Sequence, residues 1–479
     1  MTISSPGIGS GLDVNSIITQ LMAIERKPLD ALQTKSTAIK AQISEFGKIK
    51  SAMSTLRDAA RALTDNTTWG MTLGTSSDAA SVAVNVTGGA AVGNFSVQVL
   101  ALARAQSLAS QSFAAATAKP GAGTLHIETG TWDSGQTAFT PGAAPGVDIA
   151  VAATDTLADV RDKINAAGAG VTATILTDAG GARLLLRSGT TGLGNAFRTS
   201  VTDADGNNAD ALGLSAFAFD PSTGAAVMSQ TETAADASAT FNGLAISSAS
   251  NTLANLVDGV TLTLAGVTPA PVAISITQDS AGMKKSVQAF VDAYNALAKL
   301  IGGQVKYDAA NKVAGPLQGD SAAVGIQRQM RSLVGAASGA SSAFSRLSDI
   351  GLQMQQDGSL SVDGTKLDAA FAKLPELKKL LANSDPLVSA NNGIARQFRM
   401  MGDALLGATG AITTRTDGLN QRIETNQDQQ DRLQTRLAQT QQRLLAQYTA
   451  LDARLGQMNA LSTYVTQQMT MLMNSSKKD

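Results

Sequence analysis

The sequence contains no cysteine and only one histidine among its 479 residues. Without thiols the chain can form no disulfide framework, no thiolate metal site and no cysteine nucleophile. The single imidazole, His126, lies in an expected strand over 124–128, where a structural or surface role is predicted. A histidine-dependent catalytic triad or zinc site is therefore not expected.

Charged and aromatic side chains are also scarce, at 16% and 4% of the chain, and 37 basic against 38 acidic residues leave a net charge of −1. This balance predicts no nucleic-acid partner and no membrane partner. The first basic residue is Arg26 and no long apolar run occurs, so neither a cleavable secretory signal nor a spanning helix is expected. The length suggests about three domains of roughly 100–200 residues each.

What is present begins with helical periodicity near the N-terminus. Asp13 is a plausible N-cap, and a short amphipathic helix is predicted to end near Lys27, because Pro28 is disfavoured in a helix interior. A second, long helix is expected to start at Pro28. It carries two apolar rows at seven-residue spacing, which indicates a coiled-coil seam. The stalk contacts predicted in this region are Ile17, Leu21, Phe46, Ile49, Met53, Leu56 and Leu63.

The C-terminal region offers a helical partner. An apolar row at seven-residue spacing runs from Ile423 to Leu472 and is interrupted by Gln430. Its companion row is mostly polar, so this helix is expected to fold fully only against the N-terminal helix or against helices of another protein. An ordinary helical hairpin packed on one domain is the alternative. The contacts predicted here are Leu437, Leu444, Leu451, Leu455, Met458, Leu461, Val465 and Leu472.

Between the helical ends the apolar period changes from 3.6 to 2, which is typical of β-strands. Strands over 82–86 and 95–99 are predicted to pair as a β-hairpin. Three further hairpin turns are expected at Asp178–Gly181, Asn242–Gly243 and Asp258–Gly259.

The rest of the middle region gives two weaker patterns. A short helix from Leu157 is expected to end at Gly168. The segment 104–156, which is rich in small residues and contains three prolines, is predicted to be irregular or weakly paired.

Helical periodicity resumes at Val287, so the β-rich region behaves as an insertion. The predicted fold class is α+β multidomain, with an α-helical coiled-coil stalk formed by both chain termini and inserted β-rich, antiparallel-sheet head domains. The expected domains are an N-terminal stalk segment (1–75), a β-rich head in two parts (76–110 and 238–279), an inserted outer head (111–237), a helical leg (280–405) and a C-terminal coiled-coil segment (406–479).

Sequence motifs that carry chemistry are missing or incomplete. No GxxxxGK[ST] phosphate loop occurs, and Gly7, Gly9 and Gly11 have no strand before them, so they are interpreted as flexible turns. The acidic loop that starts at Asp203 places Asn208 and Leu214 where a calcium loop needs glycine and glutamate. Acidic pairs for a hydrolase occur on any surface, but aromatic residues to stack a sugar are few. We therefore predict no enzyme activity and no catalytic, cofactor-binding or metal-binding residues.

Several blocks of the sequence resemble one known family. The opening over 4–29, from Ser4-Ser5-Pro6-Gly7 to Glu25-Arg26-Lys27-Pro28-Leu29, is similar to that of bacterial flagellar filament cap proteins (flagellar hook-associated protein 2). Blocks within 93–106, 251–262, 290–295, 347–360 and 451–464 resemble the same family in the same order. The resemblance covers roughly 4–110 and 238–479. Within 111–237, the helix ending at Ile164-Asn165 and the hairpin after it resemble a head module of several flagellar axial proteins.

The resemblance implies a structural protein exported through the flagellar type III apparatus, with an export chaperone on its C-terminal helix. It would assemble as a ring-shaped homo-oligomer at the distal tip of the filament, outside the cell. There it would retain exported flagellin and promote its folding and polymerisation. Two alternatives remain: a surface adhesin whose β-rich head binds host glycans or mucus, and another flagellar axial component such as a junction protein or minor flagellin.

Overall fold

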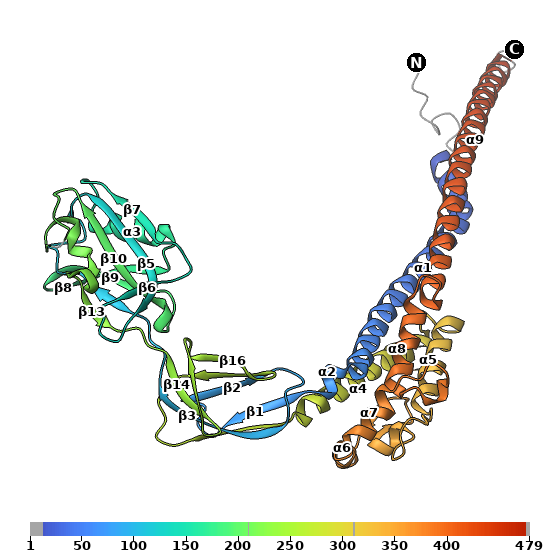
Figure 1. Cartoon of the computed structure of the whole chain (residues 1–479). Helices are drawn as coiled ribbons and strands as arrows, with labels where there is room; N and C mark the ends of the chain where they lie inside the picture. Colours follow the sequence, from blue (N-terminus) through green and yellow to red (C-terminus); the bar gives the residue numbers. More distant parts are fainter. Residues whose placement is uncertain (1–12, 209, 310–311, 476–479) are drawn as a thin grey trace. The chain divides into compact units, whose positions relative to one another are not determined.

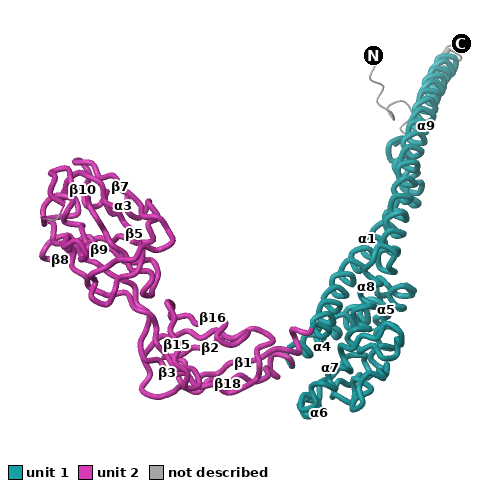
Figure 2. Tube along the Cα trace, viewed as in Figure 1, with its two compact units in different colours: residues 1–65, 284–479 teal, residues 66–283 magenta. Residues whose placement is uncertain are grey.

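The computed structural model describes residues 13–208, 210–309 and 312–475. The first part of the opening block that resembles the family, residues 4–12 with Gly7, Gly9 and Gly11, lies outside these residues. The chain divides into two compact units, residues 1–65 with 284–479 (unit 1) and residues 66–283 (unit 2), as Figure 2 shows. Unit 1 is mainly helical and unit 2 mainly antiparallel β. The predicted α+β class, with a β-rich insertion between two helical ends, is therefore confirmed, whereas the finer domain boundaries stay a prediction.

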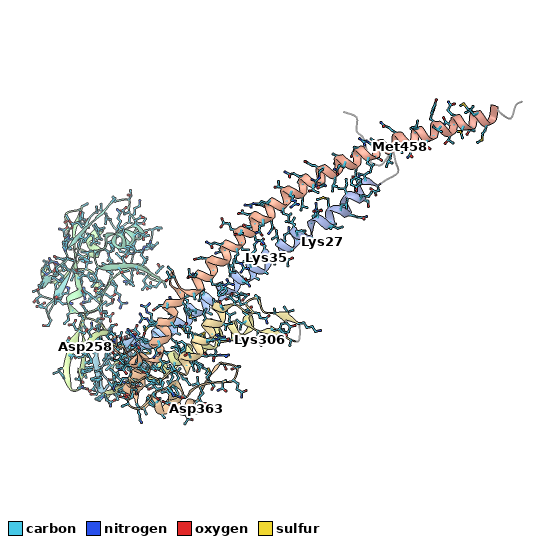
Figure 3. All side chains as sticks on the ribbon, turned by 90° about the vertical axis from the view of Figure 1, so that its right-hand side faces the viewer. Lys27, Lys35, Asp258, Lys306, Asp363 and Met458 are labelled. Atoms are coloured by element: carbon cyan, nitrogen blue, oxygen red, sulfur yellow. The ribbon has the colours of Figure 1, made fainter. Side chains whose placement is uncertain are left out.

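Unit 1 is built around two long helices, α1 and α9, which lie side by side in Figures 1 and 3. Short hairpins connect some of the helices. The elements are α1 (Val14–Thr64), α4 (Ser280–Val305), β19 (Tyr307–Asp308), β20 (Val313–Ala314), α5 (Ser321–Val334), β21 (Leu352–Met354), β22 (Leu360–Val362), α6 (Gly364–Phe371), α7 (Leu374–Ala382), α8 (Ile394–Leu406) and α9 (Ala411–Ser475).

Helix α1 runs without a break through Pro28, so the predicted end near Lys27 is wrong. The proline ring holds a φ angle that suits a helix, and what is lost is the N–H that would bond the Ile24 carbonyl. Pro28 and Ile24 are both exposed, so water can bond that carbonyl instead. The predicted N-cap is confirmed, because the Asp13 carboxylate accepts a 2.9 Å hydrogen bond from the Ser16 N–H.

The inner part of unit 2 contains two sheets that share one core. One has five strands in the order β1 (Thr72–Ser76), β18 (Val272–Gln278), β3 (Gly93–Ala101), β14 (Ala237–Phe241) and β15 (Leu244–Ser248); the other has β16 (Thr252–Val257), β17 (Val260–Leu264) and β2 (Val82–Val86). The short helix α2 (Asn66–Trp69) precedes β1.

The predicted hairpin of 82–86 with 95–99 is wrong, because β2 and β3 lie in different sheets. Val86 of β2 is opposite Val260 of β17, whereas β3 pairs with β18 and β14. Val82 and Val97 nevertheless belong to the same buried cluster. Both strands have the alternation expected of half-buried strands, but they cover one core from two layers and take partners from distant parts of the chain.

The outer part of unit 2 has its own core. A six-stranded sheet contains β12 (Ala225–Ala226), β11 (Phe219–Asp220), β10 (Ala196–Asp203), β5 (Gly123–Trp132) and β6 (Phe139–Pro141), with β7 (Val147–Val151) also paired to β5; a four-stranded sheet contains β13 (Ser229–Glu232), β4 (Ser107–Ala109), β9 (Gly181–Ser188) and β8 (Val171–Asp178). Helix α3 (Leu157–Ala167) packs with them.

The segment 104–156 is therefore not irregular, and that prediction is wrong. It supplies four strands, and β5 pairs with β10 along eight residue pairs from Ala196↔Gly130 to Asp203↔Gly123. Leu125 and Ile127 fill the core, while the glycines and threonines elsewhere in β5 lower the apolar signal of the segment.

The other local predictions for unit 2 are confirmed. Strands β8 and β9 pair up to Asp178↔Gly181, and β16 and β17 pair at Val257↔Val260. The β14–β15 turn places Asn242 at φ +50° and Gly243 at φ +84°, which is the left-handed backbone that this residue pair favours. Helix α3 ends at Gly168, also in the left-handed region.

Candidate interaction surface of the stalk helices

We call the pair of helices α1 and α9 the stalk. The section where the second half of α1 lies beside the start of α9 is a closed core. Every residue that the sequence predicted from the middle of α1 onward is fully buried there: Phe46, Ile49, Met53, Leu56 and Leu63 each have 0% of their surface exposed. Ala60 is equally buried, and Ile412 and Leu419 of α9 are at 0% as well. These side chains stabilise unit 1 itself and are not open to another protein.

The last turns of α1 pack against α8, a partner that the heptad analysis missed. The Arg57 Nε lies 3.8 Å from Asp403 Oδ1. A Cβ added to Gly402 would lie 2.7 Å from the Arg57 Cβ, so glycine allows the two backbones to approach closely. The signal was present, because Ile394, Phe398, Met401 and Leu405 follow helical spacing and are buried on one face.

Farther along the stalk, a polar pair occupies the seam. Asn426 is 3% exposed, and its Oδ1 accepts a hydrogen bond from the Gln430 side chain. The Asn426 Nδ2 is buried with no hydrogen-bond partner. A buried amide in a coiled-coil seam reduces stability but favours one register over others.

The next section is a smaller apolar cluster where α1 begins. Val14, Ile18 and Met22 are buried with Leu437, and Leu444 packs partly buried against them. The predicted contacts Ile17 and Leu21 are only half-buried. The buried face of this part of α1 instead carries Val14 and the residues four and eight positions after it.

Beside this cluster lies a groove of about 380 Å³ between the two helices. Met22, Leu29 and Leu437 supply apolar lining, and Arg26 and Asp30 supply charge. An apolar floor with a polar rim can hold one side chain of a further helix.

The end of α9 is exposed. We call Leu451, Met458, Leu461, Val465 and Leu472 the distal stripe; their exposed fractions are 45%, 66%, 63%, 51% and 64%. Four of them repeat every seven residues and so lie along one side of the helix. Leu455 is half-buried. Figure 3 shows Met458 on α9, well beyond Lys27 and Lys35 of α1.

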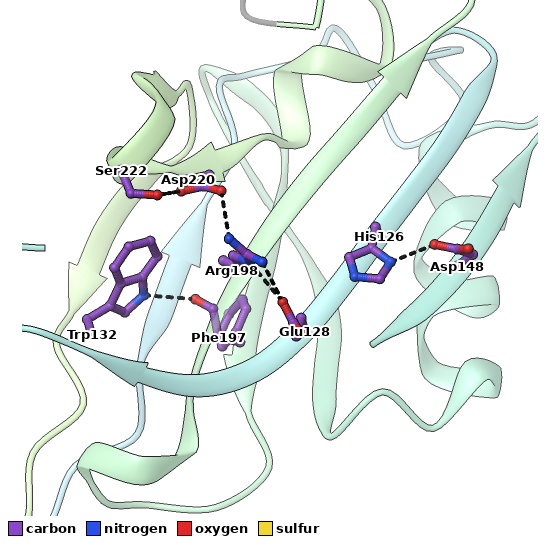
Figure 4. A network of polar contacts seen from close by, with 8 residues as sticks. All are labelled: His126, Glu128, Trp132, Asp148, Phe197, Arg198, Asp220 and Ser222. Carbon is purple, nitrogen blue, oxygen red and sulfur yellow. Dashed lines mark hydrogen bonds and ion pairs between the residues drawn. The ribbon is translucent and has the colours of Figure 1, made fainter. Parts of the chain in front are cut away.

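A polar network in the outer part of unit 2 contains the single histidine (Figure 4). The His126 Nδ1 lies 2.6 Å from Asp148 Oδ1 and so ties β5 to β7. Nearby, the Arg198 guanidinium lies 2.8 Å from Glu128 and 3.3 Å from Asp220, which ties β10 to β5 and β11. Each contact joins neighbouring strands, as a structural role for His126 requires.

The acidic loop after β10 is occupied by internal hydrogen bonds. Burial raises the pKa of Asp203, but hydrogen bonds from the Ser215 N–H and hydroxyl and from the Asp205 N–H outweigh it and lower the pKa overall. Within 13–208, 210–309 and 312–475, no group of three or more His, Cys, Asp or Glu side chains is placed to hold a metal ion. None of the helices described is long and apolar enough to cross a membrane.

Three family descriptions match the chain. "Flagellar hook-associated protein 2 C-terminus" matches residues 234–460, "Flagellar hook-associated protein 2 N-terminus" matches 10–106, and "Flagellin hook IN motif" matches 134–190. The last match covers β6 to β9 completely, including α3.

Full-length relatives agree. The chain is 32% identical to the B-type flagellar hook-associated protein 2 of Pseudomonas aeruginosa, with 99% of each chain covered. It is 31% identical to flagellar hook-associated protein 2 of Escherichia coli K12, with 98% of each covered.

A solved structure supports the fold. The crystal structure of the D1-D2-D3 domains of the flagellar cap protein FliD from Escherichia coli superposes with a TM-score of 0.62 at 29% identity. It covers 78% of this chain and 99% of that one. The end-to-end match to named relatives and the shared fold lead to one conclusion: the chain belongs to the flagellar hook-associated protein 2 family.

Proposed function

We propose that this protein is a structural cap at the distal tip of the bacterial flagellar filament, where it retains exported flagellin and promotes its folding and polymerisation. The observation that carries the proposal is the match to cap-family relatives over 99% of the chain. The distal stripe supports it, because a helix that ends in exposed apolar residues needs partner helices to bury them. The relatives' names describe structural proteins, which supports a non-catalytic role.

The distal stripe is the surface proposed to meet helices at the filament end. Leu451, Leu461 and Val465 are each about half exposed or more, so a docking helix would remove much of their apolar surface from water. Full burial of such a side chain contributes about 1.5–3 kcal/mol, before the cost of ordering the partners. Several such contacts give useful affinity without permanent attachment, as a cap that stays on a growing filament requires.

Polar residues in the heptad rows are proposed to keep these contacts exchangeable. Gln430 lies in the stalk seam beside Asn426, Thr440 is half-buried and Gln447 is exposed. Replacement of Gln430, Thr440 and Gln447 by leucine should tighten helix contacts and slow or stall filament growth. Growth at the normal rate in cells that carry the triple variant would show that these interruptions are not needed for exchange.

Three finer statements belong to the same proposal. The chain assembles as a ring-shaped homo-oligomer, it acts outside the cell, and it travels through the type III export apparatus with a chaperone on its C-terminal helix. The exposed end of α9 supports the chaperone site, because an export partner that shields the distal stripe would prevent aggregation before assembly.

Deletion of the chain in its host tests the function directly. We expect abundant free flagellin in the culture medium and few or no filaments by microscopy, and both defects should disappear when the wild-type chain is restored. Normal filaments with no free flagellin would contradict the cap function and would favour the adhesin alternative.

A further inference from the structure

The chain's oxidisable sulfur is concentrated at one place. It has 14 methionines and no cysteine, so no thiol competes for an oxidant. Among the residues that the structure describes, six methionines are exposed, and four of them lie at the end of α9; the six are Met354 (44%), Met400 (54%), Met458 (66%), Met469 (54%), Met471 (65%) and Met473 (60%). By contrast, Met53 and Met283 are fully buried.

Two of the exposed methionines on α9, Met458 and Met469, lie on the side of the distal stripe, and Met471 and Met473 lie beside its last member. Met458 is a member of the stripe, one heptad before Val465. Met469 lies about three helical turns beyond Met458 and therefore on the same side. Met471 and Met473 are the sequence neighbours of Leu472, so each projects about 100° to one side of it. A helix partner that buries the stripe would therefore bury thioethers together with leucine and valine side chains.

We propose that Met458, Met469, Met471 and Met473 form an oxidation site that weakens docking of the distal stripe. The oxidant is a two-electron oxygen donor of the peroxide or hypochlorous acid class. The thioether sulfur is oxidised to a sulfoxide by taking up one oxygen atom. Hydrogen peroxide is thereby reduced to water, and hypochlorous acid is reduced to chloride with release of one proton.

The physical effect follows from the change of polarity. A methionine side chain is flexible and apolar, whereas its sulfoxide carries a strong hydrogen-bond acceptor. To bury that oxygen against an apolar helix without a donor weakens binding by about tenfold for each group. The inference rests on the proposed cap function, because it uses the same surface for docking.

The test uses the purified full chain, untreated or treated with hydrogen peroxide, added to host cells that lack it. Mass spectrometry of the tryptic peptide that follows Arg454 measures sulfoxide at the α9 end, and the peptides with Met354 and Met400 measure it elsewhere. Two matched variants are compared: one with the four α9 methionines replaced by leucine, and a control with Met354→Leu and Met400→Leu. Leucine keeps volume and helix propensity, so both variants should fold.

We expect the untreated wild-type chain to restore filaments and the oxidised chain to restore fewer by at least about tenfold, the loss expected for one buried sulfoxide. The α9 variant should resist the oxidant, and the control variant should remain as sensitive as wild type. Equal restoration by a chain whose α9 methionines are fully oxidised would overturn the inference, as would equal sensitivity of the α9 variant. If the untreated chain restores no filaments, the proposed cap function fails instead.

Discussion

The two ends of helix α9 share one heptad spacing and have opposite environments. At its start, Ile412 and Leu419 are completely buried against the rest of unit 1. At its end, Leu461 and Val465 are 63% and 51% exposed. A heptad row thus identifies the face of a helix that will be buried, but the partner that buries it can lie in the same chain or in another one.

The place where the environment changes follows from the length of α1. That helix begins at Val14, which packs in the cluster around Leu437, and α9 continues to Ser475. Because an α-helix rises about 1.5 Å per residue, the distal stripe extends far beyond that cluster. The closed section should therefore control stability and the open section should control assembly.

The largest expected effect is on the stability of the closed section. Phe46→Ala removes a fully buried ring, and we expect the free energy of unfolding of unit 1 to fall by about 3–5 kcal/mol. Urea unfolding followed by circular dichroism measures it. The matched control Leu461→Ala should change stability by less than about 0.5 kcal/mol, and an equal loss in both variants would contradict the division of α9 into two sections.

The ion pair at the start of α9 should have the next largest effect. The Arg415 guanidinium contacts Asp320 at 2.8 Å, and the Asp320 side chain is 3% exposed. Arg415→Met leaves that carboxylate buried without its cation, so we expect a loss of about 2 kcal/mol in urea unfolding. The control is Arg454→Met, because Arg454 is an exposed residue of α9. A comparable loss of stability in this control would contradict the difference between the two ends of α9.

The buried Asn426 side chain in the stalk seam should lower the free energy of unfolding slightly. Asn426→Leu replaces a side chain whose Nδ2 has no partner with an apolar one. We expect a gain of about 1 kcal/mol in the same unfolding measurement. Gln447→Leu, at an exposed position, should leave stability unchanged. A loss on Asn426→Leu would mean that the amide is satisfied in solution.

Acid should weaken unit 1 and leave the exposure of the distal stripe unchanged. Hydrogen bonds from Lys379, Ser341 and Ser342 lower the pKa of Glu376 from 4.5 to about 2. This carboxylate therefore stabilises the fold fully above pH 4.5, and the contribution is lost as the pH falls toward 2. Glu376→Gln should flatten the decline of stability in that window, and an unchanged pH profile would contradict it.

Local patterns were enough to predict much of this fold. Turn residues such as Asn242-Gly243 and Gly168 require special backbone angles, and they mark the same turns in the structure. The predicted hairpin of 82–86 with 95–99 failed because strand pairing depends on contacts far apart in the chain. The strands of 104–156 were hidden because glycines and threonines make up half of β5 and lower its apolar signal.

For the candidate surface, the residues were predictable and the partners were not. Phe46 to Leu63 and the distal stripe have the same sequence periodicity, yet the first group is buried within the chain and the second is exposed. The helical spacing of α8 indicates that one of its faces is buried, but it does not show that α1 covers that face through a close approach at Gly402.

The most direct test of the interaction surface is filament growth in cells whose only copy of the chain carries Leu461→Asp and Val465→Asp. Both side chains are exposed, so the variant should unfold at the same urea concentration as wild type. We expect short or absent filaments and free flagellin in the medium, because charge on the distal stripe prevents its burial by partner helices. Filaments of normal length, with no free flagellin, would show that the distal stripe is not the surface that holds the cap in place.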